Sequence, residues 1–207
     1  MKNLLYILLL APLLVFVSSC EEDNQESNNE PLYEIGDIAE GGFVFYIDET
    51  GEHGLVAAME DLTEGATDPN EWGFNGYEWG CYGEYVDGAD GTSIGTGYQN
   101  TMDIVNQGCA TQNGGVTAAQ AALDTEINGY SDWYLPSKDE LYQMCNTIGN
   151  GGPAGNIGGF ETSNWPDYWS SSENNPGSAW DVNFNDGVAS NGSDKDDAGR
   201  VRVIRAF

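Results

Sequence analysis

The chain has few basic side chains. Its 207 residues include 6 Lys and Arg against 34 Asp and Glu, which gives a formal net charge of -28 at pH 7. Proteins hold a phosphate backbone with clusters of lysine and arginine, and so few basic residues cannot build such a surface. We therefore expect no nucleic acid partner. The same charge disfavours polyanionic glycans, because the protein would repel them.

The chain also has a single histidine. His53 lies in an expected turn, and neither a second histidine nor a nucleophile motif accompanies it. A Ser-His-Asp or Cys-His centre would have to be built around this one residue. We therefore expect His53 to be an exposed turn residue and the protein not to be an enzyme.

No segment has the spacing of a calcium-binding EF-hand loop. The acidic runs at 87–91 and 194–197 are too short to specify coordination. We expect no cofactor and assign no metal ligand. Calcium is compatible with the many carboxylates, but the sequence does not predict it.

No apolar run is long enough to span a bilayer. The longest one, from Leu4 to Val17, falls short of the roughly 20 residues that a transmembrane helix needs. It follows Lys2 and ends in Ser18-Ser19-Cys20, the pattern of a secretory signal peptide with a lipoprotein cleavage site. We expect residues 1–19 to be cleaved and Cys20 to carry the lipid that attaches the protein to a membrane.

Residues 20–34 are expected to form an acidic tether. From Glu21 to Pro31 the sequence has no aromatic or branched apolar residue, so it cannot bury enough surface to offset its ordering entropy. A short acidic segment directly after the lipidated cysteine resembles the export signal of Bacteroidetes-type surface lipoproteins. This resemblance implies a lipid-anchored protein of the bacterial outer membrane, displayed at the cell surface.

The remainder, residues 35–207, is expected to form one domain. Two β-rich runs, Gly42–Asp48 and Leu55–Ala58, predict a hairpin because a glycine-bearing turn separates them. The glycine-rich stretch from Glu64 to Gly97 shows no clear period and is expected to be an ordered loop held by its aromatic residues.

Helices are signalled by two capping boxes, which begin at Thr117 and Ser137. In this motif the hydroxyl and the side chain three residues later satisfy free amides reciprocally. We expect helices over about 117–127 and 137–148. A third is expected over 101–107, because a glycine follows it.

The C-terminal part predicts two further strands. One is half-buried, since apolar residues alternate with polar ones at positions Trp180, Val182 and Phe184. The other, Val201–Phe207, is expected to tie down the C-terminus. The order of hairpin, helices and strands predicts an α+β fold.

Three cysteines follow the proposed lipidation site. Cys81 and Cys109 lie in loop-like positions, whereas Cys145 falls on the apolar face of the helix predicted over 137–148. Disulfides persist in the oxidising compartments that a signal peptide implies. We predict a Cys81–Cys109 disulfide and a buried free thiol at Cys145.

Several ordered segments between Gly36 and Phe207 carry a resemblance to a known family: Gly36–Tyr46, Gly95–Thr101, Gly129–Leu141, Tyr168–Glu173 with Ala179-Trp180, and Val201–Arg205. Together they resemble the Lcl C-terminal domain family, named for the C-terminal domain of a Legionella collagen-like adhesin. The resemblance implies a C-type-lectin-like domain, with short helices packed on small antiparallel sheets, and a role in binding or adhesion. The namesake binds sulfated polysaccharides, but the charge of this chain argues against that ligand.

Candidate binding residues are sought on the polar strand face and the loops. Trp133, Trp169 and Trp180 are expected in the core. Amides, carboxylates and aromatic rings suit hydroxyl-rich sugars, and a merely solvated loop surface is the alternative. The candidate ligand-binding residues are Trp165, Tyr168, Asn174, Asn175, Asp181, Asn183, Asn185, Asn191 and Asp194.

The sequence therefore predicts a lipid-anchored cell-surface protein that binds a glycan or a protein ligand. One alternative is a structural component of a surface or fimbrial assembly. A less favoured one is an enzyme on surface glycans or proteins, which would need a pair of carboxylates in a cleft.

Overall fold

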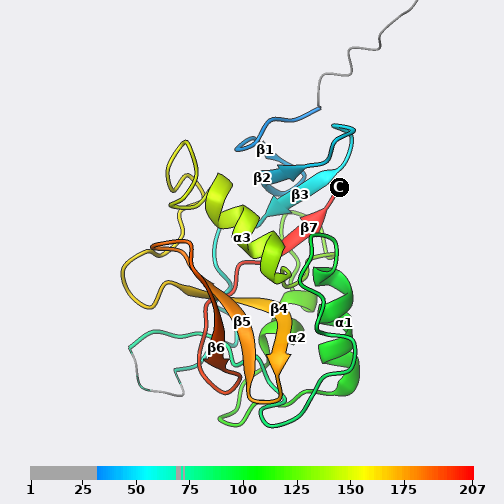
Figure 1. Ribbon diagram of the computed structural model, residues 1–207. Helices are drawn as coiled ribbons and strands as arrows, with labels where there is room; N and C mark the ends of the chain where they lie inside the picture. The colour runs from blue at the N-terminus through cyan, green and yellow to red at the C-terminus, as the bar shows by residue number, and fades with distance from the viewer. Residues whose placement is uncertain (1–31, 69–70, 72) are drawn as a thin grey trace, which may run out of the picture.

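The computed structural model describes residues 32–68, 71 and 73–207 (Figure 1). The predicted signal peptide, the lipidated Cys20 and all of the tether before Leu32 lie outside the described residues. None of the helices in the described part is long and apolar enough to cross a membrane.

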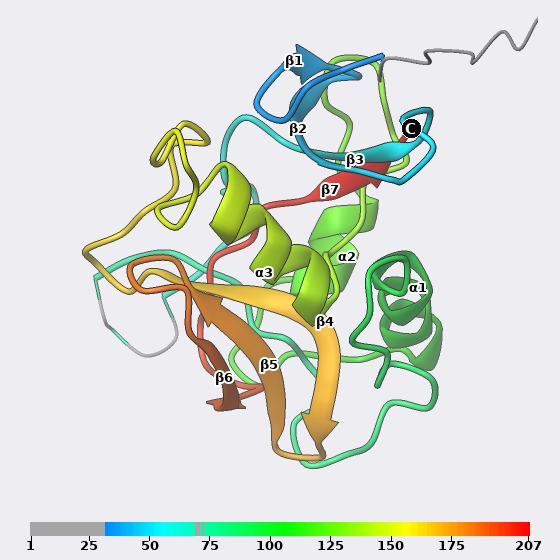
Figure 2. The same cartoon turned by 45° about the horizontal axis from the view of Figure 1, so that its top comes forward.

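The fold is α+β, as the order of elements in the sequence predicts. Its ten helices and strands in the described part are β1 (Ile38–Ala39), β2 (Gly42–Ile47), β3 (Gly54–Ala57), α1 (Gly97–Gln107), α2 (Ala118–Leu123), α3 (Lys138–Thr147), β4 (Asp167–Asn175), β5 (Ser178–Asn183), β6 (Ala189–Asp194) and β7 (Ile204–Ala206). One antiparallel sheet has the order β1-β2-β3-β7 and the other has the order β4-β5-β6. Helix α3 contacts strands of both sheets and so joins them (Figure 2).

The predicted hairpin and closing strand are both present. Strands β2 and β3 pair antiparallel, and β7 pairs with β3. The strand proper begins later than predicted, at Ile204. The residues before it remain extended, because the carbonyls of Val201 and Val203 accept hydrogen bonds from the backbone of Leu62 and Ala58. The C-terminal segment therefore ties the hairpin to the rest of the domain.

The two capping boxes differ in how far their helices extend. At α3 the box is complete, since the Glu140 carboxylate accepts from the Ser137 amide at 2.7 Å and the Ser137 hydroxyl accepts from the Glu140 amide at 3.3 Å. At α2 only half of the predicted box forms: the Thr117 hydroxyl accepts from the Gln120 amide at 3.2 Å, but the Gln120 side chain donates to Asp124 at 2.8 Å instead. This helix ends at Leu123 rather than near Ile127, because Ile127 exchanges backbone hydrogen bonds with Tyr130 in a tight turn.

Helix α1 is longer than predicted. It begins at Gly97, four residues before Thr101, and ends as predicted at Gly108, whose φ of 76° is left-handed. A side chain at Gly97 would place its Cβ 2.2 Å from the Glu140 carboxylate. The first turn of α1 therefore packs against the capping box of α3, a contact that local sequence cannot indicate.

The core has two clusters of buried side chains. Trp79, Trp133 and Trp169 lie in the first, and Phe45, Tyr168 and Phe184 lie in the second. The prediction of core positions is confirmed for Trp133 and Trp169. It is wrong for Trp180, which is only half-buried, with the ammonium of Lys138 5.5 Å from its ring centroid.

The long loop between β3 and α1 is ordered where the structure describes it. Tyr77 and Trp79 are buried, and the backbone of Tyr77 pairs with that of Gly199. The indole N–H of Trp79 donates to the carbonyl of Ser170 at 2.9 Å. The expectation that aromatic residues hold this loop is therefore confirmed.

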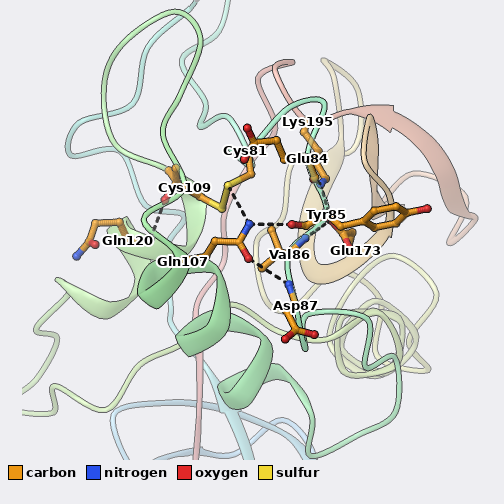
Figure 3. Close-up of a disulfide and its surroundings, with 11 residues drawn as sticks. Cys81, Glu84, Tyr85, Val86, Asp87, Gln107, Cys109, Gln120, Glu173 and Lys195 are labelled. Carbon is orange, nitrogen blue, oxygen red and sulfur yellow. Dashed lines mark hydrogen bonds and ion pairs between the residues drawn. A yellow bond between two sulfur atoms is a disulfide. The ribbon is translucent and has the colours of Figure 1, made fainter.

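The predicted disulfide joins Cys81 to Cys109 (Figure 3). It fastens the loop after Trp79 to the end of α1. The Gln107 amide next to it donates to the carbonyl of Tyr85 at 2.7 Å. Cys145 is a buried free thiol, as predicted. His53 is exposed, also as predicted.

A buried ion pair lies beside the disulfide-held loop. The Lys195 ammonium is fully buried and donates to the Glu173 carboxylate at 2.6 Å and to the Glu84 carbonyl at 2.9 Å (Figure 3). It also lies 4.6 Å from the ring centroid of Trp79. The same Glu173 oxygen accepts from the Val86 amide at 2.9 Å. One pair thus joins β4, the residue after β6 and the loop before α1.

We predict that Lys195→Met destabilises the domain by about 3–5 kcal/mol, because it leaves the Glu173 carboxylate buried without its cation. The double variant Lys195→Met/Glu173→Leu should recover a large part of this loss. Urea unfolding measures both. Lys138→Met is the matched control, because Lys138 pairs with Asp139 at the surface and should change stability by less than about 1 kcal/mol. Equal losses for the two single lysine variants would contradict a structural role for the buried pair.

Candidate ligand-binding cleft

A cleft of about 260 Å³ opens against one face of the β4-β5-β6 sheet. Its walls come from all three strands, from the segment before β4, from the loop after β6 and from the loop before α1. The lining residues are Phe74, Trp165, Asp167, Trp169, Asp181, Gly192, Ser193, Asp197, Ala198 and Gly199. Three aspartates, two tryptophans and a phenylalanine therefore face one small space.

Strand register brings the central residues together. Trp169 on β4 is the pairing partner of Asp181 on β5, and Asp167 pairs with Asn183. Since side chains two residues apart share a face of a strand, Asp167 and Trp169 point the same way. The Asn183 amide donates to the Asp167 carboxylate at 2.8 Å, which fixes that side chain at the edge of the cleft.

Asp181 has an incomplete set of hydrogen bonds. Its side chain is buried, with 4% exposed, and its Oδ2 accepts from the Ser193 hydroxyl at 2.6 Å. Its Oδ1 is buried without a hydrogen-bond partner, the one such side-chain atom found among the described residues. A buried polar atom without a partner costs about 1–3 kcal/mol, and more when it is charged.

Burial raises the pKa of Asp181 to about 6, because the charged carboxylate loses its hydration. The Ser193 hydroxyl lowers this pKa by stabilising the charged form, and the nearby Asp167 carboxylate raises it. The backbone amide of Asp181 and the Ser190 hydroxyl lower it further, although neither lies within hydrogen-bond geometry of Oδ1. Perturbed carboxylates in clefts are characteristic of functional sites, although structural networks perturb them too.

Trp165 lies at the rim of the cleft with 44% of its surface exposed. Its φ of 51° is left-handed, a conformation that a bulky residue adopts at a cost of about 1–3 kcal/mol. Arg200 holds it there by donating to the carbonyls of Trp165 at 3.0 Å and Asn164 at 2.9 Å. The Trp165 ring therefore lies at the rim of the cleft, and the hydrogen bonds from Arg200 fix the backbone that carries it.

One wall of the cleft forms where the backbone at Gly199 lies close to the indole ring of Trp169. A Cβ on Gly199 would lie 2.5 Å from the indole nitrogen of Trp169, so only glycine fits there. That indole N–H donates to the carbonyl of Tyr77 at 2.8 Å. The segment from Asp197 to Gly199 can therefore lie directly over Trp169 and close the cleft.

The structure brings together only part of the predicted binding set. Trp165 and Asp181 line the cleft, and Asn183 supports its wall through Asp167. Tyr168 was expected to contact ligand, but this is wrong. It is fully buried on the other face of β4, where its hydroxyl donates to Asp61 at 2.8 Å and accepts from the Glu161 amide at 2.9 Å.

The other predicted residues do not line the cleft. Asn174 and Asn175 are exposed at the β4–β5 turn, where both amides donate to the Ser178 hydroxyl. Asn185 is exposed beyond β5, and Asp194 is exposed at the end of β6. Asn191 lies in β6, and its side chain is outside what the structure describes.

The prediction missed Asp167, Ser193 and Asp197, as well as the aromatic Phe74. Asp167 directly precedes the Tyr168–Glu173 motif, so the register of a β4–β5 hairpin would have placed it opposite Asn183. The others enter through tertiary contacts of loops and an irregular edge strand, for which the sequence carries no periodic signal.

A larger hollow of about 760 Å³ lies elsewhere, between the 59–65 segment and residues 116–128. Five of its lining residues are acidic: Glu60, Asp61, Glu64, Asp124 and Glu126. Asp61 is already used, since it accepts from Arg202 at 2.7 Å and from Tyr168 at 2.8 Å. None of these carboxylates is buried without a partner, so we favour the smaller cleft as the binding site.

No group of three or more His, Cys, Asp or Glu side chains within the described ranges is arranged to hold a metal ion. The three aspartates of the cleft do not form such a group.

These features define a class of small α+β domain that carries a carboxylate-lined cleft on an antiparallel sheet. Residues 88–205 match the Lcl C-terminal domain family, and since this is more than half of the chain, the protein belongs to that family. Apart from Phe74, every residue that lines the cleft lies within the match. The segment Gly36–Tyr46, which also resembles the family, lies before it. No curated protein matches the chain.

We predict that Asp181→Asn stabilises the protein above pH 7 by about 1–2 kcal/mol, because it removes a buried charge. The folded pKa of about 6 lies above the ordinary aspartate pKa of about 4. Between these two pKa values the native state therefore binds more protons at Asp181 than the unfolded state does. As a result, the contribution of Asp181 to the free energy of unfolding falls as the pH rises from about 4 to about 6.

Urea unfolding between pH 4 and pH 8 measures this effect. The gap between wild type and Asp181→Asn should be near zero at the acidic end, where both side chains are neutral. The matched control is Asp87→Asn, which removes an exposed carboxylate outside the cleft. Parallel stability profiles for wild type and Asp181→Asn would rule out a strained carboxylate at this position.

Proposed function

We propose that this protein is a non-enzymatic, adhesin-like surface protein whose domain binds a glycan in the cleft on the β4-β5-β6 sheet. The observation that carries this proposal is the Asp181 carboxylate, which is buried in the cleft with one oxygen unpartnered. A ligand hydroxyl or N–H would supply the missing donor. The Trp165 ring at the rim offers an apolar face of the kind on which sugar rings stack.

Family membership supports a binding role. The family takes its name from a domain of an adhesin, and such domains are associated with adhesion. We propose that the fold is C-type-lectin-like, with two small antiparallel sheets joined by a helix. Fold alone does not establish function, so the weight of the proposal rests on the cleft.

The placement of the cleft is compatible with surface display. The described chain starts beside the β1-β2-β3-β7 sheet, where the Leu32 amide donates to the Gly51 carbonyl. The β4-β5-β6 sheet lies at the other end of the molecule (Figures 1 and 2). We propose that lipid on Cys20 anchors the protein in the bacterial outer membrane. The acidic tether would then leave the cleft facing outward at the cell surface.

A second candidate function is hydrolysis of a glycan. It is favoured by the raised pKa of Asp181 beside Asp167, since a glycosidase pairs a protonated acid with an ionised carboxylate. We rank binding first, because the family to which the chain belongs takes its name from a domain of an adhesin. A protein ligand and a structural role in a surface assembly are the remaining alternatives.

We predict selective binding on an array of neutral and amine-bearing glycans, without cleavage. Trp165→Ala should weaken binding about tenfold, because it removes the stacking surface at the rim. Tyr85→Ala is the matched control: Tyr85 is also a surface aromatic residue, 68% exposed, but lies outside the cleft, so binding should stay within about twofold of wild type.

Each other outcome points to a different function. Released sugars would replace the binding role with hydrolysis. Loss of binding in chelator would place calcium in the site. Equal losses for both aromatic variants would move the ligand away from the cleft, and no binding to any glycan would favour a protein partner or a structural role.

A further inference from the structure

The described lining of the cleft is acidic. Asp167, Asp181 and Asp197 belong to it, and no lysine, arginine or histidine is among the described residues that line it. Arg200 packs its guanidinium 5.0 Å from the ring centroid of Phe74, but its N–H groups donate to the carbonyls of Trp165 and Asn164. A cationic ligand would therefore gain from the cleft's charge, and an anionic one would be repelled.

The carboxylates that line the cleft favour a ligand that supplies hydrogen-bond donors. Carboxylate oxygens only accept, and the Ser193 hydroxyl already donates to Asp181. The Oδ1 of Asp181 is screened from solvent and still has no partner. A donor that reaches it must be small, because only 4% of Asp181 is exposed. A primary ammonium is small, has three donors and carries a charge opposite to that of the Asp181 carboxylate.

The size and shape of the cleft limit the kind of molecule that can bring an ammonium group into it. The volume of about 260 Å³ is slightly below the 300–1,000 Å³ typical of sites for drug-sized ligands. This suits one ring rather than a folded peptide segment. The Trp165 ring at the rim can pack on the face of such a sugar and also favours a nearby cation.

We propose that the cleft binds an amino sugar with a free, protonated amine, and that the ammonium pairs with the Asp181 carboxylate. This inference rests on the proposed function, since it specifies the class of glycan taken by the same cleft. Acetylation of the amine would remove the charge and add bulk at the point of closest contact. An N-acetylated sugar is therefore the matched ligand that the cleft should reject.

The test uses the full-length protein and titration calorimetry with two oligosaccharides of equal length, one of glucosamine and one of N-acetylglucosamine. Near neutral pH and about 0.15 M salt, which screens exposed charges, the glucosamine oligomer should bind at least about tenfold more tightly. Asp181→Asn should remove this preference. Asp87→Asn, which removes an exposed charge outside the cleft, should preserve it.

Failure of this inference is distinguishable from failure of the proposed function. Equal or tighter binding of the acetylated oligomer, still sensitive to Trp165→Ala, overturns the amino-sugar assignment and leaves glycan binding in place. A lysine oligomer that binds as tightly as the glucosamine oligomer overturns it in favour of a basic peptide. If neither oligosaccharide nor any array glycan binds, both proposals fail together.

Discussion

The position of Lys195 is the constraint on which the functional end of the molecule depends. Its amide donates to Gly177 in the β4–β5 turn, and its carbonyl accepts from Trp79 and Gly80. Its ammonium reaches Glu173 and the backbone of Glu84. Burial lowers the pKa of this lysine, and the Glu173 carboxylate opposes that effect. A single residue thereby fixes the end of β6, the disulfide-held loop and the start of the segment that closes the cleft, so cleft geometry and domain stability depend on the same contacts.

Lys195 is one case of a wider pattern. The five basic residues of the described part are all engaged within the domain: Lys138 with Asp139, Lys195 with Glu173, Arg200 and Arg202 with Asp61, and Arg205 with Asp132 and Glu40. The guanidinium of Arg205 holds the pKa of Asp132 below its ordinary value. Cations used in this way are not available to neutralise the carboxylates of the cleft. The negative charge of the described part therefore remains on its surface and in the cleft, where it would favour cationic ligands over anionic ones.

The sequence indicated the elements whose signals are local. The capping hydroxyls at Thr117 and Ser137 and the hairpin turn depend on neighbouring residues, and they appear as predicted. The Cys81–Cys109 disulfide also appears as predicted, because the local pattern placed these two cysteines in loops and Cys145 on a helix. The errors arise where tertiary contacts decide. Tyr168 looks like a surface aromatic residue in a polar stretch, yet both faces of β4 are covered, so the ring enters the second core cluster. Alternation placed Asp181 on the polar face correctly, but not its burial, because the residues that surround it come from β6 and from loops outside the β4–β5 hairpin.

The burial of Asp181 is better explained by ligand binding than by folding. An asparagine at this position could accept the Ser193 hydrogen bond without a charge to desolvate. The buried Lys195, Arg202 and Arg205 each have an opposite charge within 4 Å. The buried Glu78 and Glu140 have no cation beside them in the described part, but each accepts hydrogen bonds from two backbone amides. Asp181 instead has one oxygen without a partner among the described residues and the like charge of Asp167 nearby. A carboxylate kept in such surroundings lowers stability, and natural proteins accept such losses chiefly at functional sites. Since a donor on a bound ligand would both satisfy Oδ1 and restore its ionised form, the contact that the free protein lacks is the one that binding would supply.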